Sequence, residues 1–178
     1  MSGVLTRNRL IGLALAALVF VIDQWVKKIV DVDLGMKLHE TIDLLPFFDL
    51  TRVHNYGVSL GMFQATSTEM RWGLILVTGL IALVVLVWML REKARGDIIG
   101  LGLILGGALG NIVDRVSYGY VLDYADFHIG ELRPFMIFNV ADAAITIGVV
   151  IILARSLFVR EKDGNHDQQR ADAGLAEN

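Results

Sequence analysis

The sequence predicts an all-α membrane protein: four transmembrane helices with a small extracytoplasmic region of β-rich or amphipathic loops. Of its 178 residues, 54% are hydrophobic, and the charged residues are absent from several long stretches. A helix of about 20 residues crosses the hydrocarbon core of a bilayer. Four apolar stretches reach or approach this length, at 10–22, 72–90, 98–113 and 135–154. Because lipid offers the backbone no hydrogen bonds, each stretch is expected to be helical.

The first helix is expected at about 10–28. Its apolar stretch ends at Asp23 and Gln24, whose polar groups can reach the headgroup layer. Arg7 and Arg9 give the stretch a basic start, as in a cleaved signal peptide. No small-x-small cleavage site follows, and Asp23 interrupts the end of the stretch. We therefore favour a helix that stays in the protein.

The other three helices are expected at about 70–91, 97–115 and 136–156. The stretch from Trp72 to Leu90 is nineteen residues without a charge. Such a run argues against the alternative of a soluble bundle with buried core helices. The helices and their connections would form a single integral membrane domain at 1–160. The segment 161–178 is polar and charged, and we expect it to be a disordered cytoplasmic tail.

Basic residues flank the helices on one side. They precede the first helix, separate the second from the third, and follow the fourth: Arg7, Arg9, Arg91, Lys93, Arg95, Arg155, Arg160 and Lys162. Short basic loops stay in the cytoplasm. We therefore expect both termini there, with the segments 27–71 and 114–134 on the outer side. Trp25, Trp72 and Trp88, near the helix ends, are interpreted as an aromatic belt.

Glycines mark two regions with different expected roles. Gly102, Gly106 and Gly110 recur at four-residue spacing in the third helix, which predicts close packing on another helix rather than free exposure to lipid. The segment 47–63 mixes aromatic and β-branched residues with glycines, which predicts short strands or a membrane-surface flap. A flap around 55–63 would close over a substrate. A plain surface loop is the alternative.

The pattern Asn-x-x-Asp occurs twice, at Asn111–Asp114 and at Asn139–Asp142. In a helix this spacing puts both side chains on one face. The first copy closes the third helix and the second opens the fourth, so both lie at the outer surface. Asp142 is expected about 10 Å along its helix, seven residues past Phe135. An ionisable residue at such a depth is a functional candidate, whereas helix capping or interhelical bonding explains the two asparagines equally well.

Paired carboxylates predict a specific chemistry. The chain has no cysteine, and its four histidines, which are His39, His54, His128 and His166, lack the spacing of a metal site. Two carboxylates about 4 Å apart repel by about 4 kcal/mol at an effective dielectric of 20. One of them therefore keeps its proton near neutral pH, as in aspartic proteases. The partner of Asp142 could be Asp114, Asp123 or Asp126.

A competing function is transport, because intramembrane aspartates also mark the pathways of protons and ions. A small proton- or ion-translocating membrane protein is therefore the alternative to a peptidase. Transporters place such sites near the bilayer midplane. Here the acidic residues gather toward one membrane face. We therefore rank a peptidase above a transporter.

Five motifs resemble the signature regions of bacterial lipoprotein signal peptidase (signal peptidase II). They are "IDQWVKK", "NYGVSLGMF", "GGALGNIVDR", "VLDY" and "FNVADAAITIG", in this order within residues 10–155. The resemblance implies a membrane aspartic endopeptidase of the bacterial inner membrane, with its active site toward the periplasmic face. Such an enzyme removes signal peptides from diacylglyceryl-modified prolipoproteins. It cleaves before the lipidated cysteine with water that an aspartate dyad activates.

The resemblance assigns roles to individual residues. It implies that Asp123 and Asp142 are catalytic, and that the following residues bind substrate or support the dyad: Asp23, Asn55, Asn111, Asp114, Arg115 and Asn139. Tyr56 and Ser59 depart from the family pattern, where threonine and alanine are common. No metal and no cofactor is implied.

The same resemblance implies the partners, which are lipidated prolipoproteins, membrane lipids and the cyclic-peptide inhibitors of the family. We expect a monomer that binds no nucleic acid. Two further residues are interpreted from their positions. Asp126 is expected to be a solvated loop acid. Arg115 is expected either to snorkel to the interface as an anchor or to hold a substrate carbonyl or a lipid headgroup.

Overall fold

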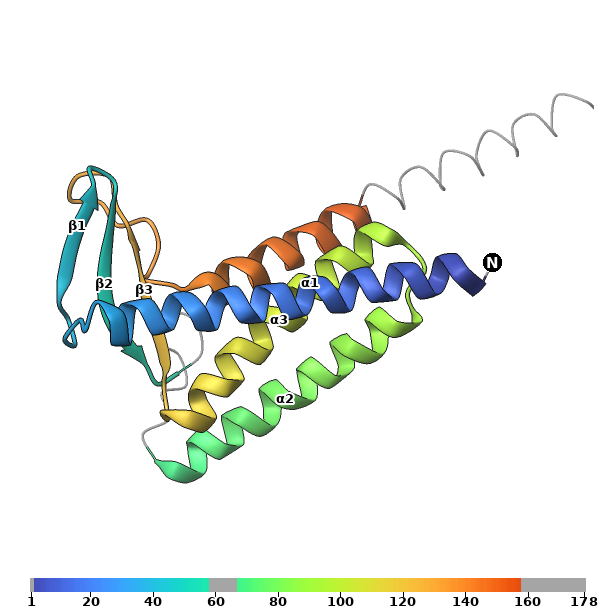
Figure 1. Ribbon diagram of the computed structural model, residues 1–178, viewed down its shortest axis with the longest axis horizontal. Helices are drawn as coiled ribbons and strands as arrows, with labels where there is room; N and C mark the ends of the chain where they lie inside the picture. The colour runs from blue at the N-terminus through green and yellow to red at the C-terminus, as the bar shows by residue number, and fades with distance from the viewer. Residues whose placement is uncertain (1, 58–66, 158–178) are drawn as a thin grey trace, which may run out of the picture.

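The computed structural model describes residues 2–57 and 67–157. These residues form four long helices, which are α1 (Ser2–Lys28), α2 (Thr68–Arg91), α3 (Arg95–Ser117) and a fourth helix at Val140–Leu157. All four contain a window long and apolar enough to cross a membrane, with mean hydropathies between 1.7 and 2.8. The helices lie side by side as a bundle (Figure 1). The predicted fold class is therefore confirmed.

A small antiparallel sheet covers one end of the bundle (Figure 1). Its strands are β1 (Thr41–Leu45), β2 (Phe48–Asn55) and β3 (Val121–Phe127), in the order β1-β2-β3. A π-helical turn, η1 (Ile29–Asp33), leads from α1 toward β1. The strands predicted in the segment 47–63 are confirmed as far as Asn55. The flap proposed for the residues beyond, 58–63, lies outside the described residues, as does the tail at 161–178.

Helix α3 packs between α1 and the fourth helix through glycines on two of its faces. A β-carbon at Gly102 or Gly106 would lie 2.8 or 2.5 Å from a carbonyl oxygen of α1. On the other side, a β-carbon at Gly107 would overlap the backbone of Ala141, and one at Gly148 would lie 2.5 Å from the carbonyl oxygen of Gly100. The glycine stripe of α3 therefore packs on protein, as the sequence predicts, because only a missing side chain permits this approach.

The fourth helix begins at Val140 rather than near 136. Phe138 pairs with Ala125 as an isolated bridge beside β3, which keeps the chain extended up to the helix. Asn139 then caps the helix. Its Oδ1 accepts a hydrogen bond from the Asp142 backbone N–H at 2.9 Å, and Asp142 Oδ2 accepts one from the Asn139 N–H at 3.3 Å. Asp142 therefore lies in the first helical turn, and the prediction that it lies about 10 Å along the helix is wrong.

The two ends of the bundle differ in what they carry. The sheet lies beyond the C-terminal end of α1, whereas the start of α1 and the connection between α2 and α3 lie at the opposite end (Figure 1). An apolar cluster that includes Val30, Met36, Leu122 and Tyr124 joins the sheet to the end of α1. This cluster fixes the position of β3, and with it the acidic residues of β3, over the ends of the helices.

Candidate active site

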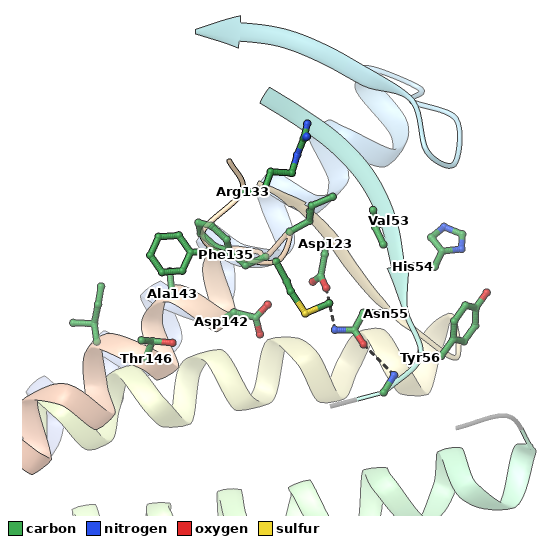
Figure 2. A pocket seen from close by; sticks show the side chains of 15 residues that line it. Val53, His54, Asn55, Tyr56, Asp123, Arg133, Phe135, Asp142, Ala143 and Thr146 are labelled. Atoms are coloured by element: carbon green, nitrogen blue, oxygen red, sulfur yellow. Dashed lines mark hydrogen bonds between the residues drawn. The ribbon is translucent and has the colours of Figure 1, made fainter. Parts of the chain in front are cut away.

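A cavity of about 890 Å³ opens between the sheet and the beginning of the fourth helix. Its walls are mostly apolar, and two carboxyl groups face it. Figure 2 shows Asp123 and Asp142 near the middle of the cavity, with Asn55 beside Asp123 and with Thr146 at one end. The lining residues come from β2, from β3, from the segment after β3 and from the fourth helix: Val53, His54, Asn55, Tyr56, Gly57, Asp123, Arg133, Phe135, Met136, Ile137, Phe138, Asp142, Ala143, Thr146 and Ile147.

The Asp123 carboxyl is held by two side-chain amides. Its side chain is buried in β3, and its Oδ1 accepts a hydrogen bond from Asn139 Nδ2 at 2.7 Å. Its Oδ2 accepts one from Asn55 Nδ2 at 3.0 Å. Both donors are neutral, so they orient the carboxyl without adding a positive charge.

The Asp142 carboxyl is held in a similar way. Its Oδ1 accepts a hydrogen bond from Asn111 Nδ2 at 2.9 Å, while its Oδ2 takes part in the cap of the fourth helix. Asn139 Nδ2 also lies 3.3 Å from Asn111 Oδ1. The two asparagines therefore connect the two carboxyl groups behind the cavity. Helix capping, one of the structural roles expected for Asn139, is present together with a contact to the Asp123 carboxyl.

The protonation of Asp123 suits acid–base chemistry near neutral pH. Burial and then the negative charge of Asp142 raise the pKa of the Asp123 carboxyl to about 7. The hydrogen bonds from Asn55 and Asn139 lower the pKa and offset part of this effect. Two carboxyl groups that share one proton can act together, one as a base toward water and the other as an acid toward a carbonyl oxygen. Their titration belongs to the pair rather than to either residue.

A second buried network lies behind the cavity and centres on Lys27. Its Nζ forms ion pairs with Asp23 at 2.7 Å and with Asp114 at 2.8 Å, and the three side chains are at most 6% exposed. Lys27 Nζ also donates to Asn111 Oδ1 at 3.2 Å. Lys27 is not among the site residues predicted from the sequence. The signal that could have found it is its spacing of four residues from Asp23, which brings the two side chains together on one face of a helix.

The two acids of this network hold the backbone beside the two cavity aspartates. Asp23 Oδ1 accepts a hydrogen bond from the N–H of Ala141, the residue before Asp142, at 3.0 Å. Asp114 Oδ2 accepts one from the N–H of Leu122, the residue before Asp123, at 3.2 Å. Neither Asp23 nor Asp114 lines the cavity. Their described contacts therefore position the backbone just before each of the two cavity aspartates.

Arg115 is buried, with 7% of its surface exposed, and it is not a snorkelling anchor. Its Nη2 donates to the carbonyl oxygen of Gly57 at 2.5 Å, and its Nη1 donates to that of Asn111 at 3.3 Å. These contacts join α3 to the end of β2, close to Asn55. The described partners of Arg115 thus belong to the chain itself.

Asp126 differs from the prediction of a solvated loop acid. It lies in β3 and is 2% exposed. Its carboxylate accepts hydrogen bonds from Arg133 Nε at 3.1 Å and from Thr51 Oγ1 at 3.3 Å. The prediction is wrong because the segment after β3 folds back and covers this position. Of the three candidate partners, only Asp123 shares the cavity with Asp142.

His54 lines the cavity and stacks on Tyr120, with the ring centroids 3.6 Å apart. Burial, followed by the charge of Arg52, lowers the pKa of His54, so its imidazole is neutral at neutral pH. Within the described residues, no group of three His, Asp or Glu side chains is arranged to hold a metal ion. The arrangement of the cavity is therefore that of two carboxyl groups with amide donors.

Comparisons with known proteins agree on one family. The family model for signal peptidase (SPase) II matches residues 15–158. A lipoprotein signal peptidase of Sphingopyxis alaskensis is 56% identical over 156 residues, which cover 88% of this chain and 90% of that protein. One from Rhizorhabdus wittichii is 49% identical over 154 residues, which cover 86% and 90%.

The fold is also shared with solved structures. A bacterial membrane enzyme determined by the in meso method at 2.3 Å resolution is 28% identical, with a TM-score of 0.73 over 82% of this chain and 87% of that one. A second bacterial membrane enzyme, at 1.9 Å resolution, is 29% identical, with a TM-score of 0.70 over 82% and 92%. Both the sequence and the multi-pass helical fold thus lead to the same assignment: the chain belongs to the signal peptidase II family of membrane peptidases.

Proposed function

We propose that this membrane peptidase cleaves diacylglyceryl-modified prolipoproteins just before the lipidated cysteine, using water activated by Asp123 and Asp142. Membership of the family supports the removal of signal peptides from prolipoproteins. The main support for the aspartate mechanism is the cavity, where two carboxyl groups from different elements lie close to side-chain amide donors. With one proton between them, such a pair supplies both a general base and a general acid.

The reaction follows from these roles. The ionised carboxylate removes a proton from water, whose oxygen attacks the carbonyl carbon of the peptide bond before the cysteine. The protonated partner donates to the carbonyl oxygen. The tetrahedral intermediate then breaks its C–N bond. The nitrogen takes the proton that the first carboxyl removed from water and leaves as the amino group of the lipidated cysteine, while the second carboxyl recovers its proton from the intermediate. The signal peptide leaves with a new carboxyl group, so one water is consumed.

The surroundings of the pair favour a lipidated substrate. Apolar residues, among them Phe135, Met136 and Ile147, line the cavity on the side of the fourth helix. Part of the wall, at Thr146 and Ile147, belongs to a membrane-spanning helix. A substrate held in the bilayer by its signal peptide and acyl chains could therefore reach the carboxyl groups without leaving the lipid.

The location and assembly of the enzyme form part of the proposal. We place the protein in the bacterial inner membrane as a monomer, with both termini in the cytoplasm and the sheet toward the periplasm. The basic residues between α2 and α3 support this orientation, because they lie at the end of the bundle opposite the sheet (Figure 1).

Cleavage of a lipidated precursor by the purified protein in lipid vesicles tests the proposed function. The product peptides are identified by mass, which gives the bond that was cut. Asp123→Asn and Asp142→Asn should each reduce turnover by several orders of magnitude while leaving the protein folded, with a thermal unfolding temperature no lower than that of the wild type. Near-normal turnover by either folded variant would exclude the dyad.

A further inference from the structure

Arg133 lines the cavity, and only one edge of its guanidinium is paired within the described part of the chain. It is the only lysine or arginine among the described residues that line the cavity. Its side chain is 51% exposed, and its Nε lies 3.1 Å from both carboxylate oxygens of Asp126. No hydrogen bond joins its Nη1 or Nη2 to any described residue. The outer donors of this guanidinium are therefore available to an acceptor that enters the cavity.

Asp126 holds this guanidinium in place without entering the cavity itself. Its side chain is 2% exposed, does not line the cavity and also accepts a hydrogen bond from Thr51 Oγ1. A buried carboxylate is stable only when it is paired. The pairing therefore restrains a long and otherwise flexible side chain, which lowers the entropy lost when Arg133 binds a ligand.

The position of Arg133 indicates which part of a substrate it would meet. Figure 2 shows Arg133 on the sheet side of Asp123 and Thr146 on the fourth helix, on another side of the two carboxyl groups. Thr146 belongs to a membrane-spanning helix, whereas Arg133 lies outside the membrane spans. A signal peptide enters from the bilayer. We expect the chain that follows the cleaved bond to leave on the side of the sheet, where Arg133 lines the cavity.

The chemistry of Arg133 indicates what it would recognise there. A guanidinium presents planar N–H donors that match the two oxygens of a carboxylate. We infer that Arg133 binds the mature segment of the substrate and favours an acidic side chain within the first few residues after the lipidated cysteine, with Asp126 as the positioning residue. The inference rests on the proposed function, because it requires a precursor peptide in the cavity.

The test compares precursors that differ by one charge. The purified full chain, in phosphatidylcholine vesicles with and without added phosphatidylglycerol, is given synthetic precursors that carry Asp, Asn or Lys at each of the first three positions after the diacylglyceryl cysteine. At one of these positions, the wild type should cleave the Asp precursor with a kcat/KM about three- to fivefold above that of the Asn precursor, as expected for a half-exposed ion pair. The difference should lie in KM, because the contact is already made before the transition state.

Variants then assign the preference to Arg133. Arg133→Gln should abolish the difference between the Asp and Asn precursors, and Arg133→Lys should retain part of it. Asp126→Asn should weaken the difference, because the guanidinium is no longer held. The matched control is Arg155→Gln, which removes a similar pair of Arg155 Nε with Asp97 at 2.7 Å between α3 and the end of the fourth helix, away from the cavity. It should keep the full preference.

The possible outcomes separate this inference from the proposed function. If the wild type cleaves the Asp, Asn and Lys precursors equally, or if Arg133→Gln keeps the preference, the inference is wrong while the proposed function stands. A loss in Arg133→Gln that is equal for all precursors and follows the phosphatidylglycerol content of the vesicles would assign Arg133 to lipid headgroups and overturn the inference. If the wild type cleaves no precursor, the proposed function itself fails. If the Asp126→Asn variant does not fold, the effect of Arg133→Gln on the charge preference is sufficient to test the inference.

Discussion

Lys27 donates a hydrogen bond to Asn111 through Nζ and Oδ1, which are 3.2 Å apart. This contact fixes which end of the Asn111 amide is the oxygen. The Asn111 nitrogen must then point the other way, where Nδ2 donates to Asp142 Oδ1 at 2.9 Å. A buried cation on α1, together with Asn139 Nδ2 at 3.3 Å from the same oxygen, thus orients Asn111 so that Asp142 meets a donor rather than an acceptor. The site depends on this cation although Lys27 does not line the cavity.

Lys27→Met should severely destabilise the protein. It leaves Asp23 and Asp114 buried without their cation, which costs about 3–5 kcal/mol. The thermal unfolding temperature in detergent measures the effect. Lys28→Met is the matched control, because Lys28 is the exposed neighbour on the same helix and its loss should change stability by about 0.5 kcal/mol or less.

The triple variant with Lys27→Met, Asp23→Asn and Asp114→Asn separates stability from the orientation of Asn111. Without the buried charges, the unfolding temperature should recover much of the loss. Turnover should stay low, because Asn111 Oδ1 still lacks the Lys27 donor. Full recovery of turnover together with stability would show that Lys27 serves the fold alone.

The activity should fall as the pH rises through about 7. The pKa of Asp123 is raised to about 7, so the pair loses its remaining proton above this pH and with it the general acid. A profile of kcat/KM against pH measures this limb. Asn55→Ala removes a hydrogen bond that lowers the pKa of Asp123, so the limb should move to higher pH. A limb that stays in place would contradict the assignment of the limb to Asp123.

Stability should respond to the same group. A carboxyl whose folded pKa lies above its unfolded value of 3.8 binds its proton more tightly in the folded state. The free energy of unfolding should therefore decrease as the pH rises from about 4 to about 7. Asp123→Asn should reduce this slope, which denaturant titrations at several pH values can measure. An unchanged slope would mean that the raised pKa belongs to another group.

Gly106→Ala should weaken the contact of α3 with α1. The new β-carbon would lie 2.5 Å from the carbonyl oxygen of Ala16, so the helices must separate, at a cost of about 1–3 kcal/mol. The unfolding temperature in detergent is the readout. Gly79→Ala on α2 provides the control, because nothing lies within 4 Å of a β-carbon there. Equal effects of the two substitutions would contradict the packing role of Gly106.

The orientation in the membrane can be tested with single cysteines, since the chain has none of its own. Exposed positions are available on both sides of the bundle, at Lys37, Lys93 and Glu131. A thiol reagent that does not cross membranes should label cysteines at 37 and 131 in cells with a permeabilised outer membrane, but not one at 93. Labelling at 93 alone would reverse the proposed topology.

Local composition was enough to predict the helices, their close packing and the family. Uncharged stretches predicted the four helices, because a chain in lipid must satisfy its own backbone hydrogen bonds. The spacing of Gly102 and Gly106 predicted the close packing of α3. The order of five short motifs indicated the signal peptidase II family, which the comparisons confirm.

Which side chains meet depends on how the helices and strands pack in three dimensions. Asp123 shares the cavity with Asp142, while Asp114 pairs with Lys27 and Asp126 with Arg133. These pairings join residues that are far apart in the chain or lie on opposite sides of a turn, so local composition does not reveal them. The resemblance of the motifs implied the pair of Asp123 and Asp142, but not the partners of Asp114 and Asp126. The capped start of the fourth helix at Val140 has the same cause, because the pairing of Phe138 with Ala125 overrides a continuous run of apolar residues. Hydropathy indicates which segments of a chain can be buried. Helix packing and strand register decide which residues each buried side chain contacts.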